Sequence, residues 1–242
     1  MRIIGKIEIK DKYVIKPIQF EGLRKVGNPE KIIDNFYKDN FDEILIYNVT
    51  GSLYGIGWIK KFVEQVLKKT FIPVTIGGGI HNLDQAKEFF DVGVDKIAVN
   101  TSIINDFSLV EKLKKEFGCQ SVVCSIQANK IDDEWYGFTE MARTKSKLKV
   151  EDLLNRYNKS QVGEILITSV RRDGTMAGFD EELLQLCLKY NKVPIIYSGG
   201  IKSNDAKKIK NYSLDAITVS SSYYYKNFEP NEFKKNLGIN DL

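Results

Sequence analysis

Short apolar runs alternate with amphipathic stretches along the chain. Strand-like runs begin near Ile3, Glu43, Pro73, Lys96, Ser121, Glu164, Pro194 and Ala216. Between them, apolar residues recur at helical spacing in segments rich in Lys and Glu, at about 29–40, 56–69, 82–92, 107–116, 149–158, 180–190, 203–210 and 231–238. Strands that alternate with helices predict a parallel sheet, and eight such units can close into a barrel. The pattern therefore predicts an α/β protein with the (βα)8 TIM-barrel fold.

The sequence also repeats itself. Three pairs of segments match in the same order: 43–49 with 164–170 (EILIYNV, EILITSV), 73–80 with 194–201 (PVTIGGGI, PIIYSGGI), and 95–102 with 215–222 (DKIAVNTS, DAITVSSS). The first four strands thus correspond to the last four, which indicates a duplicated half-barrel. We expect one domain over residues 1–242, with half-barrels at about 1–120 and 121–242. A site in one half should have a counterpart in the other.

Composition narrows the class of protein. The chain has 242 residues, of which 43% are apolar, enough for one large core. We find no apolar run long enough to cross a bilayer and no signal peptide at the first residues, and the three cysteines show no metal-ligand spacing. A net charge of +4 suits an anionic substrate but is far from a nucleic-acid signature. We expect a cytoplasmic protein that binds neither membrane nor nucleic acid and needs no metal or cofactor.

Glycines and hydroxyl residues follow paired strands in both halves. Gly77–Gly79 precede a strand that ends in Asn100-Thr101-Ser102, and Gly199-Gly200 precede one that ends in Ser220-Ser221-Ser222. Glycines let backbone N–H groups approach a ligand, and the side chains add donors, which together can bind an anion. Each run could equally be only a tight turn. Two symmetric copies favour phosphate binding and predict an elongated ligand with a phosphate at each end.

Several residues near strand ends could take part in chemistry. Glu8 and Gln127 are inward-facing counterparts near the ends of the first and fifth strands, where two opposed carboxylates could transfer protons. Only Glu8 is a carboxylate, because an amide cannot exchange a proton at useful pH. Asn48 is another amide where catalysis could use an acid. Asp173, in the loop RRDGTMAG at 171–178, could act in acid–base chemistry or orient a ligand hydroxyl.

Four charged residues begin strands. Arg2, Glu43, Lys96 and Glu164 start the first, second, fourth and sixth strands, and so belong to the end of the barrel opposite the active site. Two cations and two anions could form a closed ring of ion pairs there. Taken alone, these residues favour a stabilising network that closes the barrel floor.

The chain resembles the histidine-biosynthesis barrel family, and within it the cyclase subunit of imidazole glycerol phosphate synthase. The resemblance covers nearly the whole length, and its most specific carriers are TIGGGIH at 75–81, DKIAVNT at 95–101, FGCQ at 117–120, GEILITS at 163–169 and RDGT at 172–175 with Gly178. In that family, a glutaminase partner docks on the barrel floor. Ammonia from the partner passes along the barrel axis to a phosphorylated substrate at the top.

The resemblance assigns roles to individual positions. It implies phosphate contacts from Lys16, Gly79, Asn100, Thr101, Gly174, Gly200, Ser220 and Ser221. It also implies that the floor ring of Arg2, Glu43, Lys96 and Glu164 acts as a gate for ammonia. Asp95 and Gln120 match positions at the glutaminase interface.

The chain departs from the family at the catalytic positions. The family's two catalytic aspartates correspond to Glu8 and Gln127, and a further active-site aspartate corresponds to Asn48. Glu8 keeps a carboxylate on a longer side chain, whereas Gln127 has lost both the charge and the proton site. The resemblance therefore suggests an ammonia-dependent synthase subunit that has diverged, as in paralogues that accompany the synthesis of nitrogen-bearing surface sugars. The alternatives are an authentic cyclase and lyase of histidine biosynthesis, and a non-catalytic scaffold that activates the glutaminase.

Overall fold

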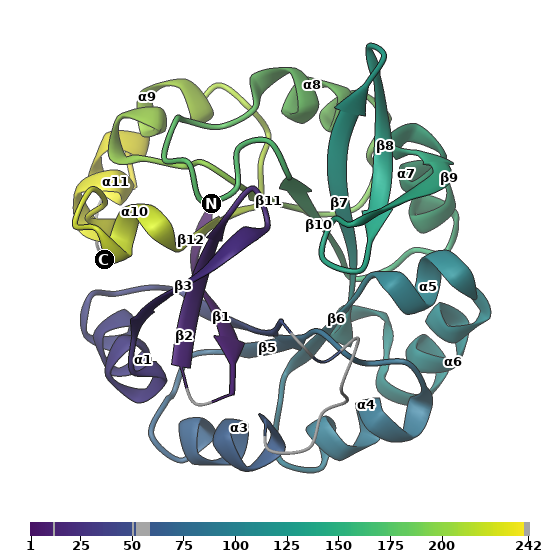
Figure 1. Cartoon of the computed structure of the whole chain (residues 1–242), viewed down its shortest axis with the longest axis horizontal. Coiled ribbons are helices and arrows are strands. Elements are labelled where there is room, and N and C mark those ends of the chain that lie inside the picture. The colour runs from purple at the N-terminus through teal and green to yellow at the C-terminus, as the bar shows by residue number, and fades with distance from the viewer. Residues whose placement is uncertain (12, 50, 52–58, 240–242) are drawn as a thin grey trace.

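The structure is a closed barrel of eight parallel strands. A computed structural model describes residues 1–11, 13–49, 51 and 59–239. The barrel strands are β1 (Arg2–Lys10), β4 (Glu43–Asn48), β5 (Val74–Gly77), β6 (Lys96–Val99), β7 (Val122–Ile131), β10 (Glu164–Ser169), β11 (Ile195–Ser198) and β12 (Ala216–Val219). Each pairs in parallel with the next, and β12 pairs with β1, so the sheet has no free edge within the barrel (Figure 1). The predicted fold is confirmed.

Helices surround the barrel, as Figure 1 shows. They are α1 (Pro29–Lys38), α3 (Ile59–Leu67), α4 (Leu83–Phe90), α5 (Thr101–Asn105), α6 (Ser108–Phe117), α7 (Val150–Lys159), α8 (Glu181–Tyr190), α9 (Ala206–Ile209), α10 (Ser221–Tyr224) and α11 (Pro230–Leu237). Of the helix expected at 56–69, residues 56–58 lie outside the described part of the chain. Within the described residues, no helix combines the length and the apolar character needed to cross a bilayer.

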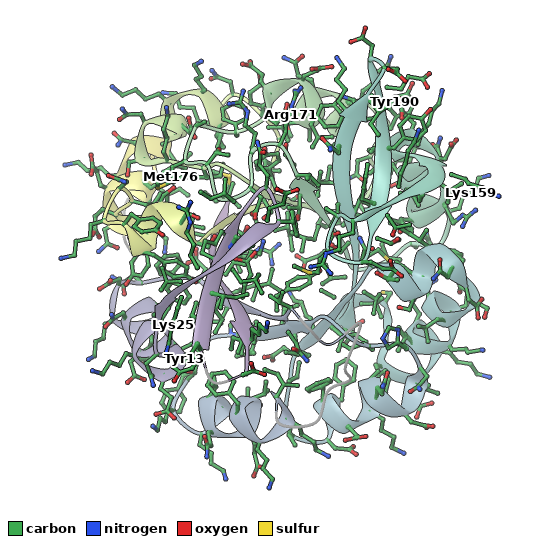
Figure 2. All side chains as sticks on the ribbon, in the orientation of Figure 1. Tyr13, Lys25, Lys159, Arg171, Met176 and Tyr190 are labelled. Carbon is green, nitrogen blue, oxygen red and sulfur yellow. The ribbon has the colours of Figure 1, made fainter. Side chains whose placement is uncertain are left out.

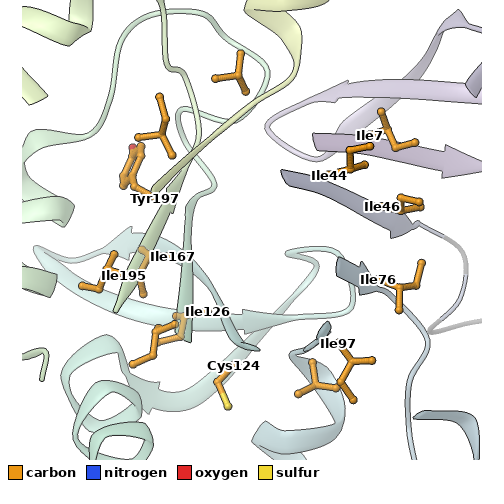
Figure 3. Close-up of a cluster of buried hydrophobic side chains, with 14 of the residues drawn as sticks. Ile7, Ile44, Ile46, Ile76, Ile97, Cys124, Ile126, Ile167, Ile195 and Tyr197 are labelled. Carbon is orange, nitrogen blue, oxygen red and sulfur yellow. The ribbon is translucent and has the colours of Figure 1, made fainter. Parts of the chain in front are cut away.

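Side chains alternate between two cores along each barrel strand. On β4, Ile44 and Ile46 pack outward against the helices, whereas Leu45 and Tyr47 face the barrel interior. Figure 3 shows the outer core, to which neighbouring strands contribute Ile76 and Ile97. Because both faces of every barrel strand are buried, these strands read as nearly continuous apolar runs.

Two antiparallel hairpins extend the sheet at the C-terminal end of the barrel, called the mouth below. β2 (Tyr13–Ile18) and β3 (Glu21–Gly27) continue from β1, and β8 (Glu134–Thr139) and β9 (Thr144–Lys149) continue from β7. The first strand of each half therefore carries the same kind of extension, in keeping with the internal repeat. On the first hairpin, the Lys25 ammonium lies 2.9 Å from the centre of the Tyr13 ring, and Figure 2 shows the two side by side. The sequence pattern did not predict the hairpins.

Candidate functional site

Two mirrored pockets open at the mouth. One lies between β5 and β6 and includes Gly78, Gly79, Asn100 and Thr101 in its wall. The other lies between β11 and β12, and its wall consists of residues 173, 174, 176, 198–201 and 218–222. These are the two regions in which the repeat predicted phosphate sites, and the structure places Gly174, Gly200, Ser220 and Ser221 together in the second pocket.

The two pockets share their backbone geometry. Asn100 and Ser220, at equivalent positions, have nearly the same dihedral angles (φ −131°, ψ −83° and φ −140°, ψ −82°). The Ser102 hydroxyl donates to the carbonyl of Ile80, and the equivalent Ser222 hydroxyl donates to the carbonyl of Ile201. The hydroxyls of Ser102 and Ser222 therefore hold the pocket walls together in both halves.

Each pocket also contains a buried polar atom that has no hydrogen-bond partner among the described residues. These atoms are Oδ1 of Asn100 and Oγ of Ser221. The Asn100 amide nitrogen donates to the carbonyl of Ser125 at 3.3 Å. A buried polar group without a partner is unfavourable, and a bound anion would satisfy the Ser221 hydroxyl. The Ser221 hydroxyl can therefore donate to an anion in the second pocket, whereas Oδ1 of Asn100 is an acceptor and gives no such argument in the first.

Four charged side chains meet at the mouth, at most 4% exposed, and are called the mouth quartet here: Lys6, Glu8, Lys16 and Asp173. Lys16 Nζ lies 2.6 Å from Glu8 Oε2 and 3.0 Å from Asp173 Oδ2. Lys6 Nζ lies 2.9 Å from Glu8 Oε1, off the ideal hydrogen-bond direction, and 3.5 Å from Asp173 Oδ1. Both lysines thus contact both carboxylates.

The neighbouring charges favour the charged forms of Asp173 and Lys6 despite their burial. Burial alone would raise the pKa of Asp173, but Lys16 and Lys6 hold that pKa below its ordinary value. Burial alone would lower the pKa of Lys6, but Asp173 and Glu8 raise it. Two positive and two negative charges balance, which is the condition under which buried ions are tolerated.

The two amides at the expected catalytic positions lie on the other side of the mouth. Gln127 and Asn48 both line the first pocket and are 5% and 3% exposed. Gln127 Oε1 accepts a hydrogen bond of 2.8 Å from the backbone N–H of Ala142, in the turn between β8 and β9. Gln127, predicted as an active-site residue, therefore anchors this turn.

The four charged strand starts form a closed ring at the floor. Arg2 donates to both Glu43 and Glu164. Lys96 Nζ lies 3.2 Å from Glu43 Oε2 and 2.9 Å from Glu164 Oε2. Each cation thus contacts both anions, as the sequence predicted. Above the ring, the barrel interior contains a layer of apolar side chains from Ile4, Leu45, Ala98, Val123, Leu166 and Ile196.

The predicted interface residues lie at this same end of the barrel. Asp95 immediately precedes β6, and its carboxylate accepts a hydrogen bond of 2.8 Å from the N–H of Val74. Gln120 lies just before β7, and both side chains are exposed. Phe71, three residues before Val74, is 84% exposed, the highest value among the large apolar side chains of the described residues.

Contacts of Arg171 anchor the loop that follows β10. Figure 2 shows Arg171 and Met176 on this loop. The Arg171 guanidinium binds Asp180 through two hydrogen bonds of 2.6 and 2.7 Å and stacks over Trp135 at 4.7 Å. Of the charged residues in this loop, Asp173 points into the mouth quartet, whereas Arg171 fixes the start of α8.

Two residues of interest were missed by the sequence analysis. Lys6 shares the inward face of β1 with Glu8, so the alternation of the strand could have identified it. Phe71 carried no signal, because exposure of a loop residue cannot be read from periodicity.

Comparisons with known proteins agree with the geometry. The family profile described as histidine biosynthesis protein matches residues 2–229. A Legionella pneumophila protein named imidazole glycerol phosphate synthase subunit HisF is 35% identical over 83% of this chain and 95% of its own length. Proteins of the same name from Thermotoga sp. (strain RQ2) and Campylobacter concisus (strain 13826) are both 32% identical, over 99% and 100% of this chain and 96% of each relative. The chain therefore belongs to the histidine biosynthesis protein family, and its described relatives include subunits of imidazole glycerol phosphate synthase.

Proposed function

We propose that the chain is the synthase subunit of a cytoplasmic glutamine amidotransferase complex. A class I glutaminase docks on the barrel floor and releases ammonia at the ring of Arg2, Glu43, Lys96 and Glu164. The ammonia passes along the barrel axis to a phosphorylated ligand held at the mouth. One observation supports this proposal above all. The two ends of the barrel carry different features: a closed ion ring at the floor, and two mirrored pockets with polar linings at the mouth.

The ligand carries a phosphate at each end. The pockets face each other across the mouth because β5–β6 and β11–β12 are equivalent in the two halves. Backbone N–H groups near Gly79 and Gly200 and the side chains of Asn100, Thr101, Ser220 and Ser221 supply the donors. Lys16 supplies a positive charge between the two pockets.

We further propose a diverged role, in the synthesis of a nitrogen-bearing surface sugar. Gln127 is an amide that binds the N–H of Ala142 and cannot exchange a proton, and Glu8 is paired with two lysines. A general acid–base pair needs groups that can gain and lose a proton near the working pH. The opposed pair of a cyclase is therefore incomplete, while the floor that receives ammonia is intact.

The decisive experiment measures how tightly glutamine hydrolysis is coupled to ammonia incorporation in the complex. The chain is mixed with a class I glutaminase from the same organism, and glutamine hydrolysis and ammonia incorporation are measured together. Substituting Lys96→Ala opens the floor ring, so hydrolysis should continue while incorporation falls. Unchanged coupling in this variant would remove the gate from the proposal.

The first alternative, an authentic cyclase and lyase, is favoured by the names of the relatives. It is tested with the phosphorylated ribulosyl formimino-carboxamide substrate and an ammonium salt at high pH. In this alternative Glu8 and Asp173 carry the proton transfers, and imidazole formation at the rate of an ordinary synthase would discard the diverged role.

The second alternative is a non-catalytic scaffold, which the buried ion pairs of Glu8 and Asp173 would suit. Titration with a sugar bisphosphate distinguishes this scaffold from an enzyme. If the ligand does not bind, and the glutaminase is nonetheless activated by the chain, the scaffold is correct.

A further inference from the structure

The ion pairs of Lys16 conflict with its proposed role in phosphate binding. The proposed function needs its ammonium near a ligand phosphate, yet the structure holds it against Glu8 at 2.6 Å and Asp173 at 3.0 Å, with 1% of its surface exposed. If Lys16 left without replacement, two buried carboxylates would lose their counter-charge. Removing one partner of a buried ion pair is strongly unfavourable.

Lys6 is close enough to both carboxylates to neutralise them when Lys16 moves away. Its ammonium approaches the other oxygen of each carboxylate, 2.9 Å from Glu8 Oε1 and 3.5 Å from Asp173 Oδ1. It comes from the inward face of β1, on the floor side of Glu8, with the rings of Phe20 and Tyr47 at 5.9 and 5.8 Å. Lys6 does not line either pocket, so it can remain with the carboxylates when a ligand binds.

Lys16 needs to move only a short way. Its partner Asp173 and the adjacent Gly174 belong to the wall of the second pocket. The end of β2 is tied to the same loop, because the N–H of Gln19 donates to the carbonyl of Asp173 at 2.8 Å. The Lys16 side chain therefore lies at the border between the mouth quartet and the pocket.

We propose that Lys6 is a positioning residue for ligand binding, the standby counter-ion that holds Glu8 and Asp173 while Lys16 turns to a phosphate of the ligand. The proposal rests on the proposed function, since it requires a phosphorylated ligand at the mouth. The effect of Lys6 on ligand affinity is indirect. The affinity for the ligand should therefore depend on the net charge that remains on Lys6, Glu8 and Asp173 when Lys16 binds a phosphate.

The test measures binding of ribulose 1,5-bisphosphate by isothermal titration calorimetry. Lys6→Met should weaken binding by about tenfold or more, because two carboxylates then compete with the ligand for Lys16 alone. The double variant Lys6→Met with Glu8→Gln restores charge balance and should bind within about threefold of the unmodified chain. Lys16→Met should bind weakly, and Lys207→Met, an exposed lysine of α9, is the matched control with no change.

The rescue distinguishes positioning from simple support of the fold. If Lys6→Met and the double variant are equally weak, Lys6 only stabilises the mouth and the proposal is wrong. If Lys6→Met binds like the unmodified chain while Lys16→Met does not, Lys6 has no part in binding, although the phosphorylated ligand stands. If the unmodified chain does not bind the bisphosphate, the proposed ligand class fails and this inference fails with it.

Discussion

Glycines at the mouth serve the packing of neighbouring loops as well as any ligand. Gly78 has a φ of +88°, and a Cβ there would lie 2.1 Å from the carbonyl oxygen of Asn48. In the second half, a Cβ on Gly200 would lie 2.4 Å from the carbonyl oxygen of Gly178. The interpretation as tight turns and the interpretation as phosphate sites are thus compatible, because a close approach of two backbones shapes each pocket.

Gly78→Ala should lower the free energy of unfolding by about 3 kcal/mol, from strain at positive φ together with a backbone clash. Gly22→Ala is the matched control, since Gly22 also has a positive φ (+66°) but nothing within 4 Å of an added Cβ. It should lower that free energy by only about 1 kcal/mol. Urea unfolding measures both. Equal effects would show that φ alone, and not loop packing, requires glycine at position 78.

The mouth quartet should make stability depend on pH through Asp173. Lys16 and Lys6 depress the folded-state pKa of this carboxyl, so its contribution is present above the unfolded value, about 3.9, and is lost as the pH falls through the folded pKa. Asp173→Asn should lower the free energy of unfolding at pH 7. It should also flatten the loss of that free energy below about pH 5. Chemical denaturation between pH 7 and pH 3 tests this, and an unchanged slope would contradict it.

At the scale of elements, the repeat was the most informative signal. It aligned strand ends across the two halves, and the two pockets and the pairing of Glu43 with Glu164 as equivalent positions follow from that alignment, whereas Arg2 and Lys96 of the floor ring came from the strand starts alone. The hairpins β2–β3 and β8–β9 were not predicted, because their mixed polar pattern resembles a loop. The pairing of Lys6 with Asp173 was also beyond the sequence, since alternation gives the face of a residue but not its partner on a distant loop.

The role of Gln127 shows the same limit. Its position predicted an active-site residue, and it does line the first pocket. Its hydrogen bond to Ala142 depends on a turn in which Glu140, Met141 and Ala142 all have positive φ, and no spacing rule gives that conformation.

Gln127→Met should loosen the turn between β8 and β9. Loss of one buried hydrogen bond, worth about 1 kcal/mol, should speed hydrogen exchange at the Ala142 amide by about fivefold. Gln120→Met, the same change at an exposed floor position, is the control and should leave this amide unchanged. Equal exchange in both variants would mean that the turn does not depend on Gln127.

At the scale of the whole molecule, the barrel separates two tasks at its ends. The floor presents exposed Asp95, Gln120 and Phe71 around a ring of ion pairs, whereas the mouth presents two small pockets and the quartet. The apolar layer between them isolates one set of charges from the other. Changes at one end should therefore leave the other end's binding intact.

Phe71 should act as an anchor for the glutaminase. Its side chain is 84% exposed at the predicted interface end, and aromatic residues dominate the energy of protein interfaces. Phe71→Ala should weaken the complex by about 10- to 100-fold, measured by titration of the glutaminase, while bisphosphate binding at the mouth is unchanged. Tyr225→Ala is the control, because Tyr225 is a 46% exposed aromatic that follows α10 at the mouth end. If both variants bind the glutaminase equally well, the partner does not contact this part of the floor.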